Sequence, residues 1–484
     1  MVSAALKNKT GFWGGIILFF LILMSPLPMP LDAKKAAAAA ALMMIWWATE
    51  CVPVAVASLV PLALYPVMPL MSMETAARHY SDPYVFLFMG GFFLALAMQK
   101  SQLHKRIALH VIRGSGGGHR RMLAGFMLAT AFVSLWVSNT AATLMMLPIG
   151  MAVLSAFKAE KGHKFNVALM LGIAYASSIG GVATLIGKPT NMIFIGQSRN
   201  LLPDLREVSF IEWSLIGFPL AAGFLILTWF YLVFVFIGSN RKDSLLEEAV
   251  SKDIHSLGKI SAAEIRVAVI FILTVLAWFW RADIRLAGIV IPGWTTLFGL
   301  RGIHDGTIAM IAAIILFVVP SGAGGRLLDW EWAKRLPWEI LLLLGGGFAL
   351  ADSFRISGLA AWIAGGFIHL EGVPEFWVIL AVCLVTVFLS ELMSNTALVA
   401  ILMPVLVPAS GLLGIHPYLL MIPATIASSF AFMMPVGTPP NAIVCGSGHV
   451  RMHQMMKAGL FLNLIGVFWV AWAAPMLIRE IYGK

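Results

Sequence analysis

Two short polar motifs interrupt long apolar stretches and are the residues best suited to bind a ligand. Ser134 is followed by Ser138-Asn139-Thr140, and Ser390 is followed at the same spacing by Ser394-Asn395-Thr396. Hydroxyl and amide oxygens, with the carbonyls freed at a helix break, suit a hard, unhydrated monovalent cation. Helix N-termini beside such a break offer N–H groups and a positive dipole end to an anion. The pattern predicts sites for a cation and an anion.

Each half of the chain also carries a Gly-x-Pro-x-Asn segment, which would break an apolar helix. These segments run from Gly187 to Asn191 and from Gly437 to Asn441, 250 residues apart, and the Ser-Asn-Thr motifs are 256 apart. A single Ser-Asn-Thr motif would be explained as polar glue between membrane helices. Two copies in register, each paired with such a break, favour an internal repeat that forms a binding site.

The composition places these motifs in a membrane. Of the 484 residues, 60% are hydrophobic and only 12% are charged, whereas soluble proteins carry about 25% charged residues. The net charge is +10, and the basic residues lie in short segments between apolar runs, as in cytoplasmic loops. This excludes a soluble enzyme and a nucleic-acid partner. We expect a multi-pass protein in lipid, in the plasma membrane or, in a bacterium, the inner membrane.

The apolar runs indicate the elements that must position the motifs. One crossing needs about 20 apolar residues, and four runs are both longer than that and interrupted by the polar motifs: 122–156, 165–197, 376–415 and 417–448. They predict two helical hairpins and two broken helices, in an all-α polytopic fold of about 11 transmembrane helices. The run 36–70 fits either one tilted helix or two short ones. The predicted parts are an N-terminal helix (1–35), a first repeat (36–238), a cytoplasmic linker (239–261) and a second repeat (262–484).

Loop charges indicate that the two repeats are inverted. The segment 104–121 carries five Lys or Arg residues, whereas its counterpart at 355–376 carries only Arg355. Positive residues stay in the cytoplasm, so the two loops are expected on opposite sides. Hairpin 122–156 would then re-enter from the cytoplasm and hairpin 376–415 from outside.

Several motifs resemble a known family, the divalent anion/sodium symporters, which are INDY-type carriers of dicarboxylates, citrate and sulfate. The resemblance rests on the paired Ser-Asn-Thr motifs and on segments 46–50, 103–109, 431–435 and 438–443. It implies a homodimer with a static scaffold domain and a mobile transport domain that works as an elevator. It also implies coupling to Na⁺, with two or more ions, and a small dianionic substrate.

The resemblance assigns site residues motif by motif. The first sodium site would use Ser134, Ser138, Asn139 and Gly187, and the second would use Ser390, Met393, Asn395 and Gly437. The substrate would meet Ser138, Asn139, Thr140, Ser394, Asn395, Thr396, Thr438 and Pro439, with Lys188 as a further candidate. No residue is assigned a catalytic role.

Lys188 departs from the family pattern, which has a small hydroxyl residue after this glycine. Its ammonium could act as a tethered cation that replaces one sodium ion, or its stem could snorkel to the cytoplasmic surface. Glu391, at membrane depth, is expected to hold the second hairpin against its neighbour through hydrogen bonds, since its repeat partner is Leu135.

Together these features predict a sodium-driven importer of divalent anions, with succinate, malate and fumarate as expected substrates. The four central segments contain no Arg, so the charge of a bound dianion must be neutralised by Lys188 and by cations. The alternatives are a sodium-independent dicarboxylate exchanger, a citrate or sulfate carrier, a channel and, from another class, an integral-membrane enzyme. An enzyme would need a cluster of titratable residues that the sequence does not show.

Overall fold

A computed structural model describes residues 2–156, 164–237, 244–286, 289–300, 302–322, 324–366 and 372–483. The first half contains α1 (Val2–Met24), α2 (Leu31–Thr49), α3 (Val54–Ala57), α4 (Val60–Val67), α5 (Met73–Tyr80), α6 (Pro83–Lys100), α7 (Leu103–Ser115), α8 (His119–Ser134), α9 (Asn139–Ala156), α10 (Lys164–Gly180), η1 (Leu185–Gly187), α11 (Pro189–Leu201), α12 (Phe210–Leu232) and η2 (Val233–Ile237).

The second half is also mostly helical. It contains α13 (Ser244–Ser256), α14 (Ala262–Phe279), β1 (Ile284–Leu286), β2 (Ile289–Ile291), α15 (Trp294–Leu297), α16 (Asp305–Val318), α17 (Trp330–Ala333), α18 (Trp338–Ile356), α19 (Leu359–Ala364), α20 (Glu375–Ser390), α21 (Asn395–Leu413), α22 (Pro417–Ala427), α23 (Pro439–Gly446) and α24 (Met452–Tyr482). Antiparallel β1 and β2 are an exception to the all-α prediction, and their Ile and Val residues favour strands.

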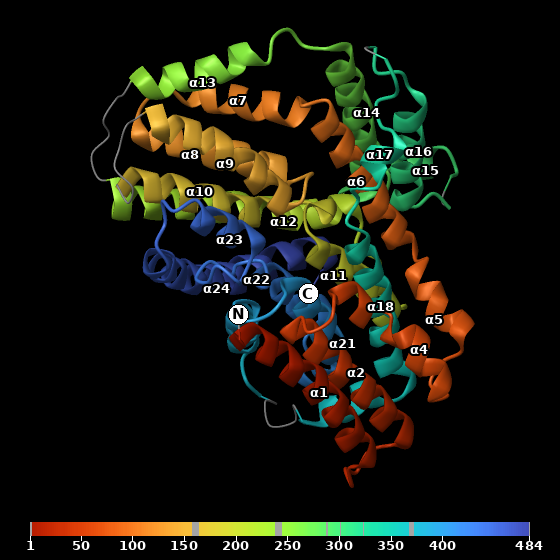
Figure 1. Cartoon of the computed structure of the whole chain (residues 1–484). Helices are drawn as coiled ribbons and strands as arrows, with labels where there is room; N and C mark the ends of the chain where they lie inside the picture. The colour runs from red at the N-terminus through yellow and green to blue at the C-terminus, as the bar shows by residue number, and fades with distance from the viewer. Residues whose placement is uncertain are drawn as a thin grey trace.

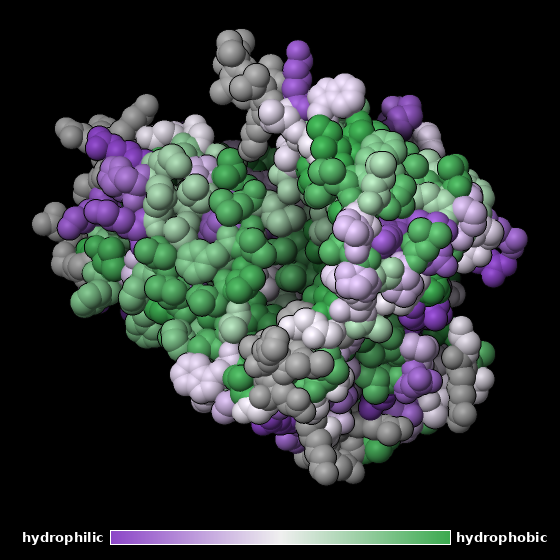
Figure 2. Space-filling model, turned by 90° about the horizontal axis from the view of Figure 1, so that it is seen from below, coloured by the Kyte–Doolittle hydropathy of each residue, from purple (hydrophilic) through white to green (hydrophobic). Residues whose placement is uncertain are grey.

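The helices are built for a lipid environment. Five helical segments of the described chain are long and apolar enough to cross a membrane, and six shorter apolar helices accompany them. Apolar side chains also face outward, as Ile272, Leu273 and Leu276 of α14 do, each more than half exposed. Figure 2 shows broad hydrophobic areas on one face of the molecule, with hydrophilic residues gathered towards its edges. Such a surface suits contact with lipid chains.

The two halves repeat the same helix pattern around their breaks. Helix α8 ends at Ser134 and α9 begins at Asn139, while α20 ends at Ser390 and α21 begins at Asn395. The second pair of elements is interrupted in the same way, because α10 is followed by η1 and α11, and α22 is followed by α23. Both α11 and α23 begin with a proline, which suits the first helical position.

The helices that carry the breaks pack against one another. In Figure 1, α8, α9 and α10 lie side by side, with α7 and α13 over them. Helix α23 contacts α9 and α10, and α22 contacts α20, α21 and α24. Gly180 lets α10 approach α8 closely, because a Cβ there would collide with the Ala131 backbone. The elements that hold the polar motifs therefore form one contiguous body.

Two boundaries differ from the sequence predictions. The N-terminal helix, expected to reach residue 35, ends at Met24, and α2 begins at Leu31. The run 36–70 is neither one helix nor two, because it spans most of α2 together with α3 and α4. The expected linker holds α13, which packs on α7 and α9. Residues 239–243 of that linker lie outside the described chain.

Candidate functional site

The hairpin tips present the Ser-Asn-Thr residues at the starts of α9 and α21. All six tip residues are half-buried: Ser138, Asn139, Thr140, Ser394, Asn395 and Thr396. The two preceding serines are fully buried. Ser134 Oγ donates to the Ser177 carbonyl of α10 at 2.6 Å, whereas Ser390 Oγ donates within its own helix to Val387 at 2.7 Å. Both hydroxyl oxygens keep lone pairs that can face a cation.

An asparagine closes each helix break with the same pair of hydrogen bonds. Asn191 Nδ2 donates to the carbonyls of Gly181 and Thr184 at 3.0 and 2.8 Å. Asn441 Nδ2 donates to the carbonyls of Ala431 and Met434, both at 3.0 Å. The spacing within the chain is identical in the two cases. The repeat seen in the sequence is therefore also a repeat of hydrogen bonds, and each asparagine holds the unwound backbone in place.

Each hairpin tip is tied to the break of its own half at equivalent positions. In the first half, Thr184 Oγ1 donates to the carbonyl of Leu135. In the second half, the carboxylate of Glu391 accepts from the backbone N–H groups of Met433 and Met434, at 2.8 Å each. The same two places in the fold are therefore joined by different chemistry.

Glu391 has the structural role expected from the sequence. Besides the two backbone N–H groups, its Oε1 accepts from Asn463 Nδ2 of α24 at 2.7 Å. Asn463 Oδ1 in turn accepts from the N–H of Phe432 at 3.1 Å. Gly437 lies against this cluster, because a Cβ there would be 2.7 Å from Glu391 Oε2. The predicted link between the second hairpin and its neighbour is confirmed, and Asn463 is a member that the sequence did not reveal.

Lys188 lies inside the protein. Its side chain is 2% exposed, and Nζ donates to the Ser429 carbonyl at 3.3 Å. Ser429 lies two residues after the end of α22 in the other half of the chain, and carbonyls at a helix C-terminus carry partial negative charge. The alternative that Lys188 snorkels to the surface is wrong, because Gly181 leaves room for the stem to run inward: a Cβ at that position would be 2.8 Å from Lys188 Cγ.

The site residues expected from the sequence form two groups, one in each half of the chain, and contacts at the helix breaks connect them. Each tip lies beside the break of its own half, and Lys188 joins the first break to the second. Among the described residues, the two Ser-Asn-Thr tips make no hydrogen bond to each other. Gly187 is tightly enclosed, since a Cβ there would be 2.5 Å from the Gly181 carbonyl oxygen, and Pro439 is exposed.

Several buried oxygens near the breaks have no hydrogen-bond partner in the described part of the chain. They are Asn395 Oδ1, Ser429 Oγ, Thr438 Oγ1, Asn441 Oδ1 and Ser178 Oγ. No group of His, Cys, Asp or Glu side chains in the same residues has a metal-binding arrangement. The atoms available as metal ligands are neutral oxygens, which suit an alkali cation better than a transition metal. Ser178, Ser429 and Asn441 were not among the predicted site residues, although each lies within or just before a break.

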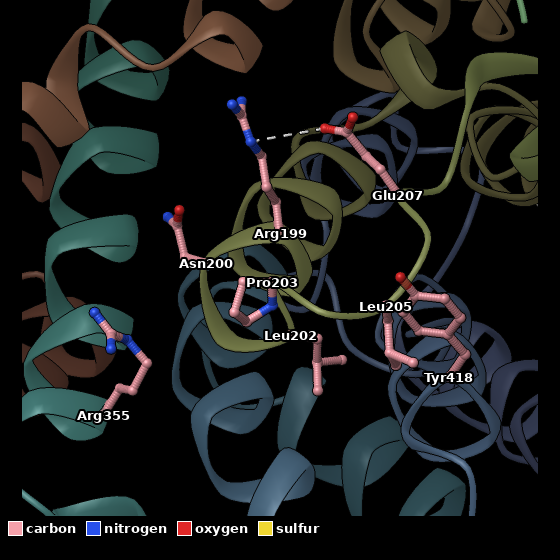
Figure 3. Close-up of a pocket in the computed structure, with 8 residues that line it drawn as sticks. All are labelled: Arg199, Asn200, Leu202, Pro203, Leu205, Glu207, Arg355 and Tyr418. Carbon is pink, nitrogen blue, oxygen red and sulfur yellow. Dashed lines mark ion pairs between the residues drawn. The ribbon is translucent and has the colours of Figure 1, made fainter.

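A separate polar pocket of about 540 Å³ lies at the ends of α11 and α18. Figure 3 shows Arg199 pointing towards Glu207, 3.9 Å away, with Arg355 on the neighbouring helix. Arg355 is already paired with Asp352 at 2.6 Å. The pocket is lined by none of the residues predicted to bind substrate or sodium, so it is distinct from the breaks.

Known proteins similar to this chain are membrane transporters. Curated relatives are the sodium-dependent dicarboxylate transporters SdcS of Staphylococcus saprophyticus and Staphylococcus aureus. The first is 37% identical over 97% of this chain and 91% of its own length, and the second is 38% identical over 93% and 87%.

Two solved structures share the fold at low sequence identity. MtrF of Neisseria gonorrhoeae, described within a class of antimetabolite efflux pumps, has a TM-score of 0.61 and 13% identity and covers 98% of this chain and 97% of its own. The YdaH transporter of Alcanivorax borkumensis has a TM-score of 0.55 and 17% identity and covers 83% and 88%. At these identities the likeness concerns the fold alone.

The family assignment rests on a match along nearly the whole chain. The family model described as the sodium:sulfate symporter transmembrane region matches residues 8–478, which include both hairpin tips and both breaks. This chain therefore belongs to the sodium:sulfate symporter family, as the paired motifs indicated.

Proposed function

We propose that this protein is a secondary active transporter that imports small divalent anions with sodium, with four-carbon dicarboxylates such as succinate, malate and fumarate as substrates. The observation that carries the proposal is the matched pair of helix breaks, each closed by an asparagine and each next to a Ser-Asn-Thr tip. The curated SdcS relatives are sodium-dependent dicarboxylate transporters. The protein is a transporter and not an enzyme, because its family and these relatives are transporters.

The substrate site is formed by the two tips and the starts of the two helices that follow the breaks. Hydroxyl and amide groups of Ser138, Asn139, Thr140, Ser394, Asn395 and Thr396 meet the carboxylates, together with Lys188, Thr438 and Pro439. Helices α9, α21 and α23 begin at Asn139, Asn395 and Pro439, and Lys188 directly precedes α11. Their N-terminal N–H groups favour a bound anion. Support comes from the half-buried position of the tips, which leaves them accessible to a solute.

Two cation sites, each built from oxygens that suit sodium, flank the substrate. The first uses Ser134, Ser138, Asn139 and the Gly187 carbonyl, and the second uses Ser390, Asn395 and the carbonyls of Met393 and Gly437. Unpartnered oxygens on Asn395, Thr438 and Asn441 support a cation in the second half. A dianion entering a site of low dielectric must be neutralised, and no Arg lies in the central segments.

The architecture proposed for transport is an inverted repeat. Hairpin α8–α9 re-enters from the cytoplasm and hairpin α20–α21 from outside, and a transport domain that carries both moves against a scaffold, as an elevator, within a homodimer. The proposal is supported by the charge difference between segments 104–121 and 355–376. The helix interruptions at equivalent positions also support it.

One other function is favoured by a specific observation. The buried ammonium of Lys188 could neutralise part of the substrate charge without any ion, as in a sodium-independent dicarboxylate exchanger. Sulfate and citrate also remain candidate substrates, because hydroxyls and N–H groups bind any compact polyanion.

The deciding experiment is uptake of radiolabelled succinate into proteoliposomes with and without an inward sodium gradient. We expect concentrative, saturable uptake only with the gradient, competed by malate and fumarate more strongly than by citrate or sulfate. Uptake that needs a counter-substrate but no sodium would identify the exchanger. Equilibration without accumulation would identify a channel and overturn the proposal.

A further inference from the structure

Lys188 is a buried cation without a carboxylate partner. Its side chain is 2% exposed, its one hydrogen bond is to the neutral Ser429 carbonyl, and no ion pair involves it among the described residues. Burying a charge is costly unless it is paired. The chain therefore keeps an expensive positive charge at the break that would form the first sodium site.

The Ser429 carbonyl can accept from this ammonium because the backbone hydrogen bonds differ between the two halves. In the first half, the N–H of Val182 donates to the carbonyl of Ile179 at 3.2 Å, which closes the turn after α10. The equivalent N–H in the second half, that of Phe432, donates instead to Asn463 Oδ1. The Ser429 carbonyl, equivalent to that of Ile179, is thereby left for Lys188.

The residue equivalent to Lys188 in the second half is Thr438, which brings an oxygen to the break in place of a positive charge. Thr438 is 1% exposed, and its Oγ1 has no partner within the described chain, like Asn441 Oδ1 at the start of the same helix and Asn395 Oδ1 at the tip of the same half. In the first half the corresponding oxygens are occupied, because Asn139 Oδ1 accepts from the Thr140 N–H at 3.0 Å and Asn191 Oδ1 accepts from Thr190 Oγ1 at 3.3 Å. The second half thus leaves the oxygens of Asn395, Thr438 and Asn441 free for a cation, whereas the first half, among the described residues, offers Ser178 Oγ and already holds an ammonium.

We propose that the ammonium of Lys188 takes the electrostatic place of one coupling sodium ion, so that sodium is bound and transported at the second site alone. This inference rests on the proposed sodium-coupled transport of a dianion. The ammonium neutralises part of the substrate charge but stays with the protein, so each transport cycle carries one sodium ion fewer than a protein with a hydroxyl residue at position 188.

The test compares wild type with Lys188→Thr, which copies the residue at the equivalent position of the second half. The control is Lys457→Thr, which removes an exposed lysine at the start of α24. Purified proteins in proteoliposomes, clamped at zero membrane potential under about a tenfold sodium gradient, accumulate a dianion by roughly tenfold for each coupled ion. We expect Lys188→Thr to accumulate succinate roughly tenfold above wild type and Lys457→Thr to match wild type.

A binding measurement covers the case in which Lys188→Thr does not transport. Sodium-dependent thermal stabilisation in detergent should show a steeper dependence on sodium concentration for Lys188→Thr than for wild type. Lys188→Met, which keeps the stem without charge or hydroxyl, should weaken succinate binding at every sodium concentration. Equal sodium dependence and equal accumulation in wild type and Lys188→Thr would overturn this inference alone. Absence of sodium-driven uptake in wild type would instead overturn the proposed function.

Discussion

At the scale of single residues, asparagine performs two different tasks in this protein. Asn191 and Asn441 donate to the carbonyls of the breaks and fix the unwound backbone in place. Asn139 and Asn395 stand at the hairpin tips, half-buried and at the first position of a helix. The amide nitrogens of the former pair are committed to the fold, whereas the latter pair is proposed to meet a solute or an ion.

Asn139→Ala and Asn395→Ala should each abolish succinate uptake and leave a folded protein. Each change removes a side-chain amide that is proposed to bind the cation and to contact the substrate, but it breaks few contacts within the fold. The measurement is uptake in proteoliposomes alongside size-exclusion profiles of the purified variants. Asn200→Ala, in the separate polar pocket, is the matched control and should transport normally. Near-normal uptake by either tip variant would remove the proposed twofold site.

Glu391→Leu places the residue found at the equivalent position of the first half, Leu135, at position 391. This change should destabilise the protein strongly. The change leaves the N–H groups of Met433 and Met434 and the amide of Asn463 without their acceptor. An orphaned buried donor costs about 1–3 kcal/mol, so the total loss should be roughly 3 kcal/mol or more. Glu391→Gln, which keeps one acceptor oxygen, should lose less.

Thermal unfolding of the detergent-purified variants measures this effect. Glu375→Gln is the control, since it weakens a half-exposed ion pair with Arg479, and such pairs contribute about 0–1 kcal/mol. If Glu391→Leu melted like the control, the carboxylate would not be what ties the second hairpin to its neighbour.

At the scale of elements, the sequence predicted the breaks better than the helices around them. Proline, glycine and the Ser-Asn-Thr motifs interrupt apolar runs, and the interruptions at 134–139 and 390–395 follow from those residues. Asn463 could not have been predicted, because it lies within an otherwise regular helix far along the chain and acts through tertiary contact. The division of 36–70 among α2, α3 and α4 was missed although the sequence carries its signals, because Glu50 caps the end of α2 and Pro53 precedes the first residue of α3.

Gly187→Ala should abolish uptake because of the backbone that surrounds it. A Cβ at position 187 would lie 2.5 Å from the Gly181 carbonyl oxygen and 2.9 Å from its Cα. Backbone atoms cannot rotate away as a side chain can, so the turn that shapes the first break must shift. The comparison is Gly411→Ala in α21, where a Cβ meets no atom within 4 Å. That variant should transport normally and be about 1 kcal/mol more stable, from helix propensity.

The measurements are sodium-dependent uptake and the melting temperature of Gly187→Ala and Gly411→Ala, each compared with wild type. Normal sodium-dependent uptake by Gly187→Ala would show that the close approach of the two glycines is not needed for the site.

At the scale of the whole molecule, the proposed transport mechanism depends on how the two halves are oriented. The halves repeat their hydrogen bonds at the breaks but differ in two residues that matter for charge, Lys188 against Thr438 and Leu135 against Glu391. An inverted pair gives a solute equivalent routes from the two sides of the membrane. In the proposed arrangement these differences would make the two routes unequal, with the fixed charge of Lys188 in one half and sodium bound in the other.

Single cysteines at Lys164 and Gly411 should be labelled from opposite faces of the membrane. Both positions are exposed. Lys164 begins α10, just after the first hairpin segment, and Gly411 lies near the end of α21, within the second hairpin segment. Lys164 ends a basic segment that should remain cytoplasmic, whereas no Lys or Arg lies in 410–417. The measurement uses a membrane-impermeant maleimide on right-side-out and inverted vesicles, after the native Cys51, Cys383 and Cys445 are replaced by alanine. The Lys164 cysteine should react only in inverted vesicles and the Gly411 cysteine only in right-side-out ones. Reaction of both in the same preparation would make the repeats parallel, and a twofold site between inverted hairpins would then be untenable.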